Sequence, residues 1–320
     1  MNTEIANAVN AARDKAQYDT RVKRVLAHKM ILAHILISTV DEFKGMKPED
    51  VAAYIEGEPK IGAVPVEPGL TNVEQVGQRI IGLNTENSEV NEGLIRFDII
   101  FYVRMKDGLS QIIVNVECQK NEPSAYKILN RAIFYVSRMV SSQKERDFAN
   151  TNYDDIKQVF SIWICMDMDY NCMSHIHLTK DDMLKPHDWK GNLDLLNIVM
   201  IGVTNDIPER GENYELHRLI GTLLSDKLKE QEKLEIIERE YNIPINRELR
   251  EEVTTMCNLS DGIEERAAAR ATKKATAETR KAIILKMYNR GDTLEQIAEV
   301  TDVSEEDIER IVRKKDLLLV

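Results

Sequence analysis

Apolar side chains recur at helical spacing near the start of the chain, between Tyr18 and Met46. Residues three or four apart lie on one face of a helix, so this pattern is typical of a helix with a buried side. Gly45 stands where a glycine commonly ends a helix. The pattern predicts one long, largely buried helix, and its apolar positions are Val22, Val25, Leu26, Met30, Leu32, Ala33, Leu36 and Ile37.

The middle of the chain changes to the pattern of β-strands. Residues 59–93 are rich in Pro, Gly and Asn and predict irregular chain with short strands. Two apolar segments then flank "KDGL", where Asp107-Gly108 is a strong signal for a two-residue hairpin loop. Further on, the pattern predicts a helix over 123–143, apolar strands at 158–166 and 194–203, and charged helices from Glu212 onward.

Composition and charge limit the class of protein. Charged residues make up 30% of the chain and hydrophobic residues 43%, which is usual for a soluble globular protein. No apolar run approaches the roughly 18 residues that span a membrane, and the start does not resemble a secretory signal. We therefore expect a cytoplasmic protein with no membrane partner. The net charge of −11 counts against a broad DNA-binding surface but still allows a local basic patch.

The pattern predicts three parts: an α/β domain over 1–210, a helical extension over 211–263, and a C-terminal module over 264–320 that consists of a basic helix and a helix-turn-helix-like segment. Between Glu264 and Arg290 there are eight basic and three acidic residues, a local charge of +5.

Cysteine and histidine give no strong metal signal. Cys118, Cys165, Cys172 and Cys257 form no C-x-x-C pair, so buried reduced thiols are the favoured interpretation. The pair His175-x-His177 could bind a metal on a strand face. A place on a loop or sheet edge is favoured, because no third ligand lies nearby in the sequence.

The hairpin itself carries the candidate chemistry. With Asp107-Gly108 as the loop, paired residue numbers sum to 215, which places Asp98 opposite Glu117. Gln119 follows two residues later on the same face, while Ile99, Phe101, Val114 and Val116 form the apolar other side. Opposed carboxylates repel, and a Mg²⁺ or Mn²⁺ ion would hold them together. Solvated acids near the open end of a hairpin are the alternative.

The order of elements from the first helix to the strand at 158–166 is αβββαβ. This resembles the PD-(D/E)XK nuclease core and, more closely, the Rpn-like recombination-promoting nucleases, the PD-(D/E)XK nuclease family transposases. The residues that carry the resemblance are "GLNTEN" at 82–87, "RFDIIF" at 96–101, "VNVECQ" at 114–119, "YKILNRAIFYVSRMVSSQ" at 126–143, "VFSIWIC" at 159–165 and "MCNLSDGIEE" at 256–265.

The resemblance implies a restriction-endonuclease-like α/β fold with a mixed sheet flanked by helices, followed by an α-helical C-terminal region. It also implies a Mg²⁺-dependent DNA endonuclease associated with mobile elements or recombination, with no organic cofactor. The residues themselves indicate strand cleavage and give no sign of transposition.

By the same resemblance, Asp98 and Glu117 hold the metal ion and Gln119 takes the place of the usual catalytic Lys. A Gln can orient water but brings no charge, so activity would depend more on the metal or on Lys120 or Arg131. Whether the site is active therefore stays open. Glu86 is a weaker candidate for an additional acid, and a solvated loop position is favoured for it.

The helix at 123–143 places four polar residues on one face: Lys127, Arg131, Tyr135 and Arg138. The opposite face is expected to be apolar and buried, with Leu129, Ala132, Ile133, Val136 and Val140. In the family this helix packs beside the active site, and its Arg and Tyr match Arg131 and Tyr135. These two residues are predicted to contact phosphate and support the metal site.

The C-terminal "YNRGDTLEQIAEVTDVSEEDIERIVRK" resembles a small helix-turn-helix. Gly291 ends one helix, Asp292 or Thr293 caps the next, and Ser304 begins another. The last helix opens on three acids, which would repel phosphate. DNA contact and a role in packing or homodimerisation both stay open for this module. A second function therefore stands beside the nuclease: a catalytically weak or inactive DNA-binding or regulatory protein on a nuclease scaffold.

Overall fold

The computed structural model describes the backbone of residues 16–66, 95–104, 111–119, 126–144, 148, 150–211 and 213–316. The chain divides into two compact units, Met1–Leu259 and Ser260–Val320. The predicted three-part division at 210 and 263 stays a prediction. Within the described residues, no helix is both long enough and apolar enough to cross a membrane.

A mixed sheet forms the centre of the first unit. Its six described strands lie in the order β1-β2-β3-β4-β6-β5. The pairs β1–β2, β2–β3 and β5–β6 are antiparallel, whereas β3–β4 and β4–β6 are parallel. The strand bounds are β1 Ile55–Val66, β2 Ile95–Arg104, β3 Gln111–Gln119, β4 Val159–Cys165, β5 Cys172–His177 and β6 Leu196–Gly202.

Helices flank this sheet and continue to the C-terminus. A helical segment at 16–26 precedes the first labelled helix. The labelled helices of the first unit are α2 Lys29–Thr39, α3 Pro48–Tyr54, α4 Ile128–Ser141, α5 Glu215–Leu224 and α6 Glu230–Tyr241, with short 3₁₀ turns at Asp41–Phe43 and Tyr153–Asp155. They are followed by α7 Arg247–Arg290, α8 Leu294–Thr301 and α9 Glu305–Asp316. The predicted α/β class, with a mixed sheet and a helical C-terminal region, is confirmed.

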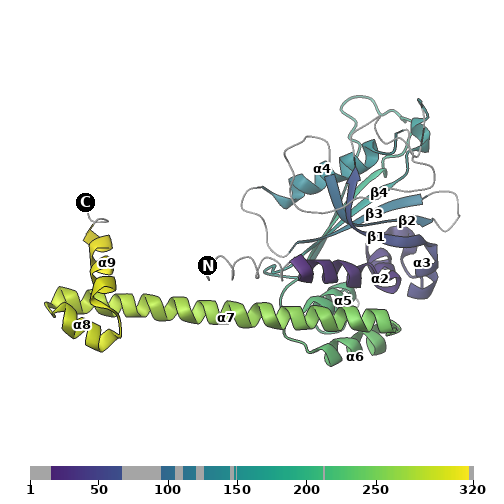
Figure 1. The fold of residues 1–320 in the computed structure, drawn as a ribbon. Coiled ribbons are helices and arrows are strands. Elements are labelled where there is room, and N and C mark those ends of the chain that lie inside the picture. Colours follow the sequence, from purple (N-terminus) through teal and green to yellow (C-terminus); the bar gives the residue numbers. More distant parts are fainter. Residues whose placement is uncertain are drawn as a thin grey trace. The chain divides into compact units, whose positions relative to one another are not determined.

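The sheet separates two hydrophobic cores. Ile99, Phe101 and Val103 of β2 pack on one side, in a large core that includes α2, α5, α6 and the first turns of α7. Ile100 and Tyr102 of the same strand belong to a smaller core under α4. Figure 1 shows α4 on one side of the sheet and α2, α3, α5 and α6 on the other. Both faces of β2 are therefore buried.

The predicted single helix over 18–46 is wrong in its continuity. The helix stops after Leu26 and α2 begins at Lys29, because His28 takes an extended conformation with φ −62° and ψ 126°. The break lets Leu26 and Ile31 on the two segments both reach the large core. Gly45, with φ +73°, lies in the turn after the 3₁₀ segment rather than at the end of α2.

The strands β1 and β5 and the helix α4 also differ from the elements predicted by the sequence pattern. The strand β1 runs from Ile55 to Val66 and so extends into the predicted irregular region at 59–93. The helix expected from 123 begins within the described residues at Ile128. The sequence pattern did not predict β5, because this edge strand has exposed polar residues where a half-buried strand would alternate. His175 and His177 therefore lie on a sheet edge, as favoured.

One side chain fixes the end of α4 to the sheet. Gln143 is fully buried, and its amide donates to the carbonyl of Lys157 at 2.9 Å while its carbonyl accepts from the Lys157 backbone amide at 2.7 Å. Lys157 lies two residues before β4 begins. The pair of bonds gives both polar atoms of the buried amide a partner and fixes the position of the end of α4 relative to the start of β4.

The C-terminal unit confirms the predicted turn chemistry. Gly291 has φ +99° after α7, and the Thr293 hydroxyl accepts from the Gln296 amide at 3.3 Å. The Ser304 hydroxyl likewise accepts from the Asp307 amide at 3.3 Å. A small core joins the three helices, and its buried members are Ile284, Ile297, Ile308 and Val312.

The first unit should lose stability on acidification through His34 of α2. Its Nε2 lies 3.2 Å from the Tyr241 carbonyl of α6, and burial lowers the pKa of His34 below its usual value of 6.5. As pH falls through about 6.5, the unfolded chain therefore takes up the proton first, and the free energy of unfolding decreases. We expect His34→Gln to flatten this dependence between pH 7.5 and 5 in urea unfolding. Parallel profiles of the two proteins would contradict the assignment.

Candidate functional site

The pairing of β2 with β3 follows the predicted register. The described pairs run from Ile99 opposite Val116 to Arg104 opposite Gln111, and each pair of numbers sums to 215. The loop at 105–110 lies outside the described residues. The described pairs end at Ile99 and Val116, and the same register carried one residue further would set Asp98 opposite Glu117. The backbone of both positions is described, whereas the side chains of Asp98, Glu117 and Gln119 lie outside the described part.

Neighbouring strands show which face of the sheet carries these positions. In the parallel pair of β3 with β4, Glu117 lies beside Trp163 and Gln119 beside Cys165. Residues in register on adjacent strands share a face. Trp163 and Cys165 pack in the core under α4, as do Ile100 and Tyr102 of β2. Positions 98, 117 and 119 therefore belong to the α4 face of the sheet.

Arg131 of α4 is held over this face by aromatic groups. Its guanidinium donates to the Tyr135 hydroxyl at 2.7 Å and to the Tyr126 hydroxyl at 3.0 Å. The guanidinium carbon lies 4.8 Å from the centre of the Tyr135 ring and 5.5 Å from the Trp163 ring. Cation–π contacts at such distances stabilise a fixed guanidinium. The cation thus lies above the β4 residue that neighbours Glu117.

Trp163 of β4 lies beneath Arg131 and Tyr135 on the sheet. It has 0% exposure, and its indole Nε1 donates to the Ser161 hydroxyl at 2.9 Å. The Tyr135 ring packs on it with centroids 5.6 Å apart. Sequence reasoning missed Trp163, Ser161 and Tyr126 as site residues. The available signal was Ser161-x-Trp163, two polar-tipped residues on one face of an otherwise apolar strand.

The predicted orientation of α4 is correct for Ala132 and Val136 and wrong for Leu129 and Ile133. The buried stripe consists of Ile128, Ala132, Val136 and Met139. Leu129 and Ile133 are exposed, as is Phe134. Leu129, Ile133 and Phe134 each stand next in sequence to a buried or half-buried residue, and consecutive residues lie about 100° apart around a helix. The helix is therefore rotated about its axis by up to this angle from the expected orientation.

The other predicted positions contribute less. Glu86 and Lys120 lie outside the described residues. His175 Nε2 is 2.8 Å from Asn197 Oδ1, which uses one ring nitrogen of the predicted His pair. Among the residues whose side chains are described, no three His, Cys, Asp or Glu side chains gather as a metal site. Asp98 and Glu117 stay the predicted ligands from the sequence, and their side chains lie outside the described part.

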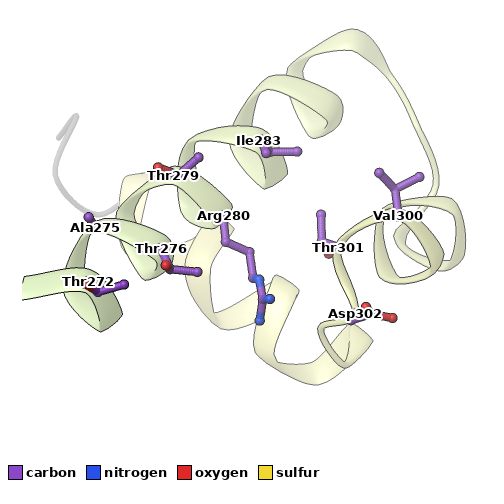
Figure 2. Close-up of a pocket in the computed structure, with 9 residues that line it drawn as sticks. All are labelled: Thr272, Ala275, Thr276, Thr279, Arg280, Ile283, Val300, Thr301 and Asp302. Carbon is purple, nitrogen blue, oxygen red and sulfur yellow. The ribbon is translucent and has the colours of Figure 1, made fainter. Parts of the chain in front are cut away.

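The C-terminal unit has a groove of about 570 Å³. Figure 2 shows Thr276, Thr279 and Arg280 on α7, with Val300, Thr301 and Asp302 at the end of α8. Arg280 and Asp302 give the groove one charge of each sign. Threonine hydroxyls supply hydrogen bonds but no acid or base for neutral pH.

Trp163 should dominate the stability of the α4 face. Trp163→Ala removes a fully buried ring and leaves a cavity, so we expect a loss of about 3–5 kcal/mol in the free energy of unfolding. Trp189 is the only other tryptophan, and its 74% exposure makes Trp189→Ala a matched control with a change within about 0.5 kcal/mol. Urea unfolding followed by circular dichroism measures both. Equal effects would contradict the assigned role.

Comparison with known protein families, with curated proteins and with solved structures found no match for this chain.

Proposed function

We propose that the chain is a metal-dependent DNA endonuclease of the PD-(D/E)XK type, from a family associated with mobile elements and recombination. The observation that carries the proposal is the β2–β3 register, which runs to Ile99 opposite Val116 and, carried one residue further, would bring Asp98 opposite Glu117. These positions share a face with Trp163 and with the Arg131 guanidinium above it. Carboxylates at these two positions, on the face that carries a fixed cation, would suit a phosphodiester.

The architecture supports this assignment. Apart from the short helix α3 between α2 and β1, the order of α2, β1, β2, β3, α4 and β4 is αβββαβ, and β4 adds parallel to β3. This is the order of a restriction-endonuclease-like core, with α4 on one face and α2 on the other. The proposal places the enzyme in the cytoplasm with DNA as its substrate. A homodimer is compatible with it.

Each polar residue then has a distinct role. Asp98 and Glu117 would hold Mg²⁺ or Mn²⁺, which supplies Lewis-acid activation of water and neutralises charge on the phosphate. Gln119 would orient the attacking water through its amide. Arg131 would offset negative charge on a phosphate oxygen, because its planar donors suit phosphate and its charge is permanent. Tyr135 and Trp163 hold Arg131 in place.

Substitution of Asp98 should abolish DNA cleavage and leave DNA binding intact. Loss of a metal ligand removes several kcal/mol of transition-state stabilisation, so Asp98→Ala should cut supercoiled plasmid at least about 100-fold more slowly in Mg²⁺ or Mn²⁺. EDTA should have the same effect on the unaltered protein, and DNA binding should persist. Asp169→Ala, at an exposed loop acid, is the matched control. Cleavage by Asp98→Ala at the normal rate would rule out the proposed site.

The alternative function is a catalytically weak or inactive DNA-binding or regulatory protein on the same scaffold. One observation favours it: Gln119 stands where a charged Lys is usual and supplies no cation. The capped helices of the C-terminal unit would then be the active part. The basic end of α9 is partly neutralised, since Arg310 pairs with Glu306 at 3.2 Å and with Asp307 at 3.1 Å.

Gln119→Lys distinguishes the two functions. If the site is catalytic and limited by its missing cation, a lysine on the same face should raise the cleavage rate, by about 10-fold for each 1.4 kcal/mol of added stabilisation. The control is the same substitution in the Asp98→Ala background, which should stay inactive. No cleavage by the unaltered protein and by Gln119→Lys alike, with DNA still bound, would favour the scaffold function.

A further inference from the structure

Large apolar groups are exposed on α4 and at Tyr126, just before the helix begins. Tyr126, Leu129, Ile133 and Phe134 are all exposed, and Phe134 is 57% exposed. Leu129 and Ile133 are one helical turn apart, as are Phe134 and Arg138. Figure 1 shows α4 as the outer layer on its side of the sheet. We call Tyr126, Leu129, Ile133, Phe134 and Arg138 the α4 outer surface.

This surface is positively charged in an acidic protein. Residues 126–144 contain Lys127, Arg131, Arg138 and Lys144 and no acid, although the whole chain has a net charge of −11. The cations lie beside the aromatic rings. The Arg138 guanidinium is 5.7 Å from the Phe134 ring, and the Arg131 guanidinium is 5.8 Å from the Tyr126 ring.

We propose that the α4 outer surface binds unpaired nucleotides of single-stranded DNA, with bases stacked on Phe134 and Tyr126 and phosphates beside Arg138 and Arg131. Exposed aromatic rings next to cations are the features by which proteins bind single strands without reading their sequence. In a duplex the base faces are already stacked, so only unpaired bases can use these rings. The inference deepens the proposed function by naming a substrate with a single-stranded stretch.

The charges argue against a second copy of the chain as the occupant. In a two-fold contact the same surface meets itself. Residues 126–144 contain no carboxylate, so such a contact would bring the Arg138 side chains of both copies together around an apolar centre. A polyanion with apolar base faces satisfies both the cations and the rings.

Arg131 connects this surface with the candidate site. One side of its guanidinium contacts Tyr126, and the other lies over Tyr135 and Trp163, beside the Glu117 position. A strand held on Tyr126 and Phe134 therefore has a phosphate within reach of the cation that serves the site. The unpaired stretch would lie next to the scissile bond.

The test is binding of a labelled oligo-dT to the full chain in EDTA, followed by fluorescence anisotropy. Phe134→Ala should weaken binding about 5- to 150-fold, the usual effect of losing one stacked base, and Phe134→Trp should restore it. Because Phe134 is exposed, Phe134→Ala should keep the circular dichroism and the unfolding temperature. Tyr170→Ala is the matched control, since Tyr170 is 68% exposed beside Asp169 and should not affect binding.

A second variant tests the phosphate contact. Arg138→Gln should lower the slope of log affinity against log salt by about 0.7, the value for one phosphate contact on a single strand. A blunt duplex of equal length should show little response to Phe134→Ala.

Three results would overturn the inference. One is unchanged oligo-dT binding by Phe134→Ala, and another is no oligo-dT binding by the unaltered protein. The third is a dimer that Phe134→Ala converts to a monomer in light scattering, which would make the surface a self-association face. Cleavage of duplex DNA without oligo-dT binding would overturn this inference alone. Oligo-dT binding that depends on Phe134 but without metal-dependent cleavage would overturn only the proposed function.

Discussion

The register between β2 and β3 is the constraint on which both cores and the candidate site depend. A strand has a period of two, so a slip of one residue would exchange its two faces. It would move Ile99, Phe101 and Val103 from the large core to the α4 side and send Ile100 and Tyr102 the other way. Burial of one such side chain contributes about 1.5–3 kcal/mol, and several would be misplaced together. Opposed like charges cost only about 0.2–1 kcal/mol. Packing therefore outweighs repulsion in setting the register, and the same register carried one residue past Ile99 and Val116 would bring Asp98 opposite Glu117.

Placement of the cation depends on packing in the same way. Arg131 projects from a helix whose buried stripe is set by Ala132 and Val136, and whose C-terminal end is fixed by Gln143. Below it, Trp163 is immobilised by burial and by its bond to Ser161. Two ring faces and two phenolic hydroxyls then restrict the guanidinium. A planar cation that is ordered before substrate arrives loses less entropy on binding phosphate than a free lysine would.

Most of the local structure could be predicted from the sequence, whereas the face of α4 that packs on the sheet could not. Asp107-Gly108 and strand periodicity were sufficient for the β2–β3 register, and Gly291, Thr293 and Ser304 were sufficient for the ends of α8 and α9. Nothing near His28 is a Pro or Gly, so the break before α2 arises from how two segments pack and not from a local signal. The edge strand β5 forms only because β6 offers it a partner. The orientation of α4 depends on β4, where Trp163 and Cys165 receive the stripe that includes Ala132 and Val136. The amphipathic pattern allows two apolar stripes, one that includes Ile128 and one that includes Leu129. Packing against the sheet decides which of the two is buried.

The orientation of α4 determines where the Arg131 guanidinium lies, which matters for a candidate site in which Gln119 supplies no charge. Had α4 buried Leu129 and Ile133, Arg131 would be turned away from Trp163 by about the 100° that separates consecutive residues. Burying Ile128, Ala132, Val136 and Met139 instead leaves Leu129, Ile133 and Phe134 exposed, at a cost in apolar surface left in water. The same rotation brings Arg131 over the indole beside position 117. The exposed apolar side and the well-placed cation are thus two results of one packing choice. Residues 126–144 contain no acid, so every charged side chain that this orientation of α4 places near the site or on the outer surface is positive. Such a distribution of charge favours binding of a polyanion.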